Sequence, residues 1–181
     1  MPKPQRRACQ ATRDPLPSWV PRHGTQRPEL VIWGAHGGAG TSTLAAWLQP
    51  AWDMGAMRAE PDPPYPAEVA SGRALVVACR DTAWASRQAT KAVSAVIAQG
   101  GQVAVLAVVS DGWPEPTIAA SRFRLLEARA GSVIRVPFVP ALRATDDPSI
   151  VALPRRARRA LAQIHVAAGQ SLSLPPLPPE T

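Results

Sequence analysis

Short apolar runs alternate with helical patterns along most of this 181-residue chain, and this alternation restricts the fold more than any other feature. The runs are residues 30–33, 74–79, 103–109 and 133–139. They are apolar at nearly every position, which is typical of strands buried on both faces of a sheet. Residues 41–49, 81–99, 117–130 and 154–168 carry apolar side chains at helical spacing instead. We therefore expect an α/β fold, a small three-layer αβα sandwich with a mainly parallel sheet.

The two ends of the chain differ in composition from its middle. Residues 1–28 carry six basic residues and many prolines without periodicity, and we expect a flexible basic, Pro-rich arm. Residues 29–168 hold all the expected strands and helices and form a single α/β domain. Residues 169–181 form a Pro-rich tail. Within the domain, residues 50–73 are also Pro-rich and contain no apolar strand.

Composition excludes several classes of protein. The longest apolar run, residues 103–109, is far below the roughly 18 residues of a membrane-spanning helix, and no apolar stretch typical of a secretory signal follows the N-terminus. Cys9 and Cys79 are too few for a disulfide framework, and the three histidines have no metal-ligand spacing. We therefore expect a cytoplasmic protein without a structural metal.

The turn between the first strand and the first helix, GAHGGAGTST at residues 34–43, has the composition of a phosphate-binding loop. The first N–H groups of a helix have no partner within the helix and lie at the positive end of its dipole. Glycines let such a backbone wrap closely around an anion. Ser42 or Thr43 offers a hydroxyl to Mg²⁺. The alternative is an ordinary tight turn without a ligand.

This loop resembles that of the ParA/MinD branch of the P-loop NTPases, which reads roughly G-K-G-G-x-G-K-T-T. Gly37, Gly38 and Gly40 match the pattern, and Ser42 falls on the magnesium-coordinating hydroxyl. Residues 34–44 are also similar to the loop G-A-H-G-G-A-G-[TV]-[ST]-T-L of an uncharacterised actinobacterial family often met on mobile elements. The resemblance implies a reduced P-loop NTPase-like domain.

Later segments extend the resemblance. Residues 74–93 are similar to the strand, loop and helix that follow the catalytic switch in that branch, and residues 135–147 to its proline turn. Asp111 stands where the branch has an Asn that faces the base. The resemblance thus implies binding of ATP or ADP with Mg²⁺, and a homodimer around the nucleotide. The implied cofactor-binding residues are His36, Gly37, Gly38, Ala39, Gly40, Thr41, Ser42, Thr43, Asp111 and Pro137, with Ser42 also the metal ligand.

Several residues differ from the ParA/MinD pattern at positions that the branch uses for hydrolysis. Thr41 replaces the lysine that reaches the β- and γ-phosphates, and His36 replaces the second, signature lysine. Residues 50–73 offer no place for the strand that ends in the magnesium-holding aspartate, the Walker B segment, or for the second switch. We therefore expect binding without efficient hydrolysis and assign no catalytic residue. Weak ATPase activity is the alternative.

The predicted function is that of a degenerate ParA/MinD-like protein with protein partners, a regulatory or scaffolding component of a mobile element or of a secretion or partition system. The alternative is a ligand-free interaction module that recruits partners through its Arg-rich arm and Pro-rich tail. A basic cluster formed by Arg155, Arg156, Arg158 and Arg159 is either a contact for nucleic acid or an anionic membrane surface, or simply a solvated helix face.

Overall fold

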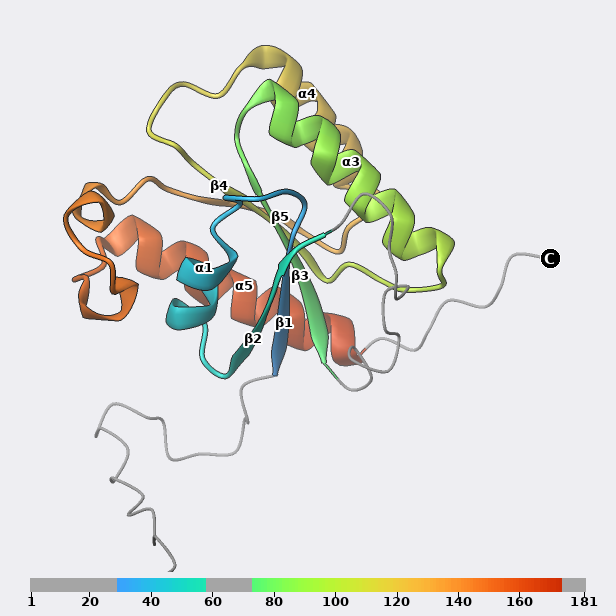
Figure 1. Ribbon diagram of the computed structural model, residues 1–181. Helices are drawn as coiled ribbons and strands as arrows, with labels where there is room; N and C mark the ends of the chain where they lie inside the picture. Colours follow the sequence, from blue (N-terminus) through green and yellow to red (C-terminus); the bar gives the residue numbers. More distant parts are fainter. Residues whose placement is uncertain (1–28, 58–72, 174–181) are drawn as a thin grey trace, which may run out of the picture.

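The computed structural model describes residues 29–57 and 73–173, which form a sheet with helices on both faces (Figure 1). The expected arm at residues 1–28 and most of the expected tail lie outside the described residues. The strands are β1 (Leu30–Gly34), β2 (Ala51–Ala56), β3 (Ala74–Arg80), β4 (Val105–Val109) and β5 (Val133–Val136). The helices are α1 (Thr41–Trp47), α3 (Ala83–Ala98), α4 (Thr117–Leu126) and α5 (Arg155–Ser173), and two 3-10 helices are η1 (Pro140–Ala144) and η2 (Pro148–Ile150).

The sheet has five strands in the order β2-β1-β3-β4-β5, and every pairing is parallel. From β1 the chain passes to β2 on one side and later to β3 on the other. A topological switch point therefore lies between β1 and β3, where open α/β sheets bind their ligands. This arrangement confirms the expected α/β fold with a parallel sheet.

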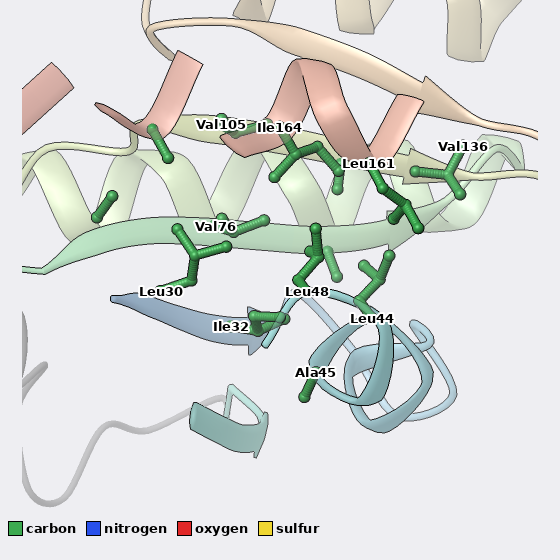
Figure 2. Packing of buried hydrophobic residues seen from close by; sticks show 14 of the residues in the cluster. Leu30, Ile32, Leu44, Ala45, Leu48, Val76, Val105, Val136, Leu161 and Ile164 are labelled. Atoms are coloured by element: carbon green, nitrogen blue, oxygen red, sulfur yellow. The ribbon is translucent and has the colours of Figure 1, made fainter. Parts of the chain in front are cut away.

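Two apolar layers hold the helices against the sheet. α1 and α5 cover one face, and α3 and α4 cover the other (Figure 1). Successive side chains of β3 alternate between the two layers: Val76 packs beneath α1 and α5, and Val77 packs beneath α3 and α4. Figure 2 shows Leu44 of α1 and Ile164 of α5 in the first layer. Phe123 of α4 is the largest fully buried side chain of the second.

A strand that the apolar pattern did not predict, β2, lies within residues 50–73. It pairs with β1 at the edge of the described sheet, and most of its side chains are exposed. An edge strand with solvent on its faces needs no continuous apolar run, so the pattern typical of buried strands does not detect it. The sequence analysis looked for apolar strands and therefore named no strand in this segment, where the structure has the exposed strand β2.

Three element ends differ from the expected ones by three residues or more. β5 ends at Val136 because Pro137 has no N–H group to continue the strand pairing. α4 ends at Leu126, and turns lead on to residue 130. α5 continues to Ser173, so the first residues of the expected tail, 169–173, are helical.

Candidate functional site

The glycine-rich loop joins β1 to α1, and three of its glycines are required by its shape. Gly38 and Gly40 have φ angles of 75° and 91°, in the left-handed region that favours glycine. A Cβ atom on Gly34 would lie 3.0 Å from Cγ2 of Thr41. Within the described chain, none of the N–H groups of residues 37–43 donates to a backbone carbonyl. The loop therefore presents several N–H groups that can bind an anion.

A cavity of about 540 Å³ lies beside this loop, at the carboxyl ends of β3, β4 and β5. Four residues of the predicted site line it: Gly40, Thr43, Asp111 and Pro137. Small-molecule sites usually measure roughly 300–1,000 Å³, so a ligand of nucleotide size is compatible with this volume. The structure thus brings the loop together with Asp111, which was predicted to face the base, and with Pro137 of the predicted proline turn.

The remaining residues of the predicted site lie outside the lining of the cavity. The side chain of Ala39 is buried in the apolar layer under α1 and α5, while Gly37 and Gly38 are exposed. Thr41 and Ser42 contact Asp53 of β2 instead. The glycine-rich loop therefore has two distinct sides, one towards the cavity and one towards β2.

Asp53 and Ser42 form a polar pair on the β2 side of the loop. Ser42 Oγ donates a hydrogen bond to Asp53 Oδ2 at 2.6 Å, and Gly55 N donates to Asp53 Oδ1 at 2.8 Å. Partial burial raises the pKa of Asp53, but the hydrogen bonds from Ser42, Gly55 and Thr41 together outweigh it, so this pKa lies below its ordinary value. Asp53 lies within β2 and not at the end of a strand, so it is an acidic residue beside the loop that the sequence analysis did not name.

His36 is buried between the loop and the end of β3. Its Nδ1 lies 2.8 Å from Gly37 O, and its Nε2 accepts a hydrogen bond from Arg80 N at 3.2 Å. An acceptor at Nε2 identifies the neutral tautomer with its proton on Nδ1. The ring also packs edge-on against Trp84, with the ring centroids 5.0 Å apart. Because backbone groups engage both nitrogens, His36 supports the fold of the loop, and a role as a phosphate ligand stays a prediction from the resemblance.

Arg80, at the end of β3, is a site residue that the sequence analysis missed. Its Nε donates to Gly38 O at 3.0 Å and its Nη1 to Ser110 O at 3.3 Å. The side chain lines the cavity and makes no ion pair with any carboxylate of residues 29–57 or 73–173. A charged residue directly after a buried apolar strand was the available signal, since such residues lie at the ligand-binding edge of a parallel sheet.

Asp111 lines the cavity from the loop after β4. Its own N–H donates to Oδ1 of the buried Asp81 at 3.2 Å, and its Oδ1 accepts from Trp113 N at 2.9 Å. The second contact is ordinary Asx-turn chemistry. Asp111 therefore stabilises its own turn and at the same time presents polar atoms to the cavity.

The far wall of the cavity is tied to α1. Trp47 Nε1 donates a hydrogen bond to Pro148 O at 2.8 Å, which joins the start of η2 to the helix after the glycine-rich loop. On the same wall, the guanidinium of Arg143 lies 4.8 Å from the centre of the Phe138 ring. These contacts hold the segment after β5 against the opening of the cavity.

The basic cluster predicted from the sequence lies outside the lining of the cavity. The cluster of Arg155, Arg156, Arg158 and Arg159 is exposed at the start of α5. In the part of the chain that the structure describes, no group of three or more His, Cys, Asp or Glu residues could hold a metal ion. No helix in that part is long and apolar enough to cross a membrane.

Comparison with known proteins adds no family to this picture. The chain matches no model of a protein family, and no curated protein matches it.

Proposed function

We propose that this protein holds a nucleotide or another phosphate ligand in the cavity beside its glycine-rich loop, without efficient hydrolysis. The observation that carries the proposal is the lining of this one cavity, which joins Gly40 and Thr43 of the loop to Asp111 and Pro137. The ParA/MinD resemblance assigns the loop residues to the phosphates of a nucleotide and the position of Asp111 to its base. The N–H groups of the loop suit the phosphate, and the Asp111 and Pro137 end of the cavity suits the base.

Ser42 and Asp53 fit the Mg²⁺ ion that accompanies such a nucleotide. Magnesium prefers oxygen ligands and is usually bound by one or two carboxylates together with phosphate oxygens and water. The Ser42 hydroxyl and the Asp53 carboxylate lie 2.6 Å apart, and the lowered pKa of Asp53 keeps it ionised at neutral pH. These two side chains would hold the ion, and the ion would supply positive charge to the phosphates.

The loop offers little support for catalysis in this proposal. Thr41 hydrogen-bonds to Asp53, and the His36 ring is held by backbone groups, so neither replaces the cation of the loop lysine. A ligand that is bound and hydrolysed slowly suits a regulatory or scaffolding component that signals its state to protein partners. We place this role in the cytoplasm, where ATP and ADP are available, and keep the mobile-element association and the homodimer as predictions from the resemblance.

Calorimetric titration of the full chain with ADP, ATP, GTP and pyrophosphate, with and without Mg²⁺, tests the proposal. We expect dissociation constants in the micromolar range and tighter nucleotide binding with Mg²⁺. Gly40→Val should abolish binding, because it adds a side chain at φ 91° beside the cavity. Gly100→Val is the matched control, since Gly100 has φ 74° but lies in the turn after α3.

The outcomes separate the candidate functions. Both glycine variants should lower thermal stability, and only Gly40→Val should lose the ligand. Absence of binding heat with every ligand would reject the proposal and leave the loop as a tight turn in a protein-interaction module. Unchanged binding in Gly40→Val would place the ligand outside the cavity.

A further inference from the structure

Residues 34–43 contain no lysine or arginine, so any positive side chain that contacts a phosphate in this cavity must come from another segment. Two arginines line the cavity, Arg143 and Arg80. Arg143 stacks on Phe138 at the wall formed after β5. Arg80 instead comes from β3, the strand beside β1, and reaches into the glycine-rich loop itself.

The contacts of Arg80 leave part of its guanidinium available. Gly38 O and Ser110 O accept from Nε and Nη1, which fixes the plane of the group between the loop and the end of β4. A guanidinium has five N–H donors in that plane, so these two carbonyls use only some of them. Within the described residues its Nη2 has no hydrogen-bond partner, and no carboxylate neutralises its charge.

We propose that Arg80 is the cation that binds the phosphate group in this cavity, in the place of a lysine within the loop. The inference rests on the proposed function and specifies which part of the ligand is recognised most strongly. A rigid guanidinium held beside the glycine-rich loop matches phosphate oxygens in charge and geometry. The site therefore selects its ligand by the phosphate, which lies at the end of the cavity that Gly40 and Arg80 line.

Titration with adenosine and with ADP separates phosphate recognition from recognition of the nucleoside. We expect the wild-type protein to bind ADP at least about tenfold more tightly than adenosine, the ratio that one charge-assisted contact provides. Arg80→Gln should reduce this ratio to near one, and Arg80→Lys, which keeps the charge, should retain part of it. Arg124→Gln, at an exposed arginine of α4, is the control and should leave the ratio unchanged.

Each contrary result has a separate meaning. An unchanged ratio in Arg80→Gln overturns the role of Arg80 while nucleotide binding stands. Wild-type protein that binds neither ADP nor pyrophosphate overturns the proposed function itself. If Arg80→Gln does not fold, Arg80→Met, which keeps the apolar stem, replaces it. Arg80→Gln and Arg80→Lys could also lose the preference for ADP over adenosine equally and have equally lowered melting temperatures without ligand. That result would make Arg80 a purely structural residue and overturn the inference.

Discussion

His36 occupies the position of a signature lysine in the ParA/MinD loop, yet its ring is bound to the protein's own backbone. Nε2 accepts from Arg80 N, and Nδ1 lies against Gly37 O. The ring thereby joins the loop after β1 to the end of β3, the two strands that flank the switch point. A residue at a predicted ligand position thus also stabilises the conformation of the loop.

Replacing His36 should destabilise the protein. His36→Ala leaves the partly buried N–H of Arg80 without its acceptor and removes the contact with Trp84, so we expect the free energy of unfolding to fall by about 1–3 kcal/mol. Urea unfolding measures the change. Lys91→Ala, at an exposed residue of α3, should stay within about 0.5 kcal/mol of wild type. An equal effect of the two substitutions would contradict the structural role of His36.

Asp53 should contribute stability that depends on pH. Its pKa in the folded protein is lowered from the ordinary 3.8, so the unfolded chain binds a proton more readily. The contribution is therefore fully present above about pH 4 and is lost as the pH falls through the folded pKa. We expect the melting temperature of wild type to exceed that of Asp53→Asn at pH 7 and the difference to shrink at pH 3. A difference that grows towards acid would show the opposite sign.

At the scale of the element, α4 shows how helical spacing divides one segment between core and solvent. Ala119, Phe123 and Leu126 are buried against the sheet and α3, whereas Ile118 and Leu125 are largely exposed. The same apolar residue type therefore has different energetic weight at neighbouring positions of one helix.

Two substitutions on α4 should differ sharply in their effect. Phe123→Ala removes a fully buried ring and should lower the free energy of unfolding by about 3–5 kcal/mol, because a cavity remains. Leu125→Ala, at a residue with 74% of its surface exposed, should change it by less than about 0.5 kcal/mol. Chemical denaturation of both variants is the measurement, and similar losses would mean that the orientation of α4 is different.

At the scale of the whole molecule, the cavity depends on contacts between segments far apart in the chain. The hydrogen bond from Trp47 to Pro148 joins residues separated by 101 positions. It fixes the segment after β5 against α1 and so sets one wall of the cavity. The site is therefore a product of the folded sheet and not of the loop alone.

Trp47→Phe should loosen that wall while the core is maintained. A six-membered aromatic ring is kept, but the pyrrole part of the indole and its hydrogen bond to Pro148 are lost, so we expect a loss of at least about 1 kcal/mol in stability and faster amide hydrogen exchange in residues 140–150. The affinity for ADP should also fall in Trp47→Phe, because this segment forms one wall of the cavity. Trp113→Phe, at a residue with 76% of its surface exposed, should alter none of these quantities. Unchanged exchange in Trp47→Phe would show that other contacts hold the wall.

Local patterns were sufficient to predict the buried elements of this protein. β1, β3 and β4 are apolar runs covered on both faces, and Thr82 caps α3 by accepting from Ala85 N, as its place in the sequence indicates. The glycines at positions 38 and 40 likewise predict a tight loop, and both have φ angles in the left-handed region that favours glycine. Such features are readable because each depends on residues close together in the chain.

The residues that surround the loop depend on the order of the strands in the sheet. β2 escaped prediction because an exposed edge strand carries no apolar pattern, and the contact of its Asp53 with Ser42 requires β2 to lie beside β1. Arg80 reaches Gly38 because β3 lies on the other side of β1. Strand order brings these charged side chains to the loop, and strand order is set by packing across the whole sheet, which no local spacing of residues encodes.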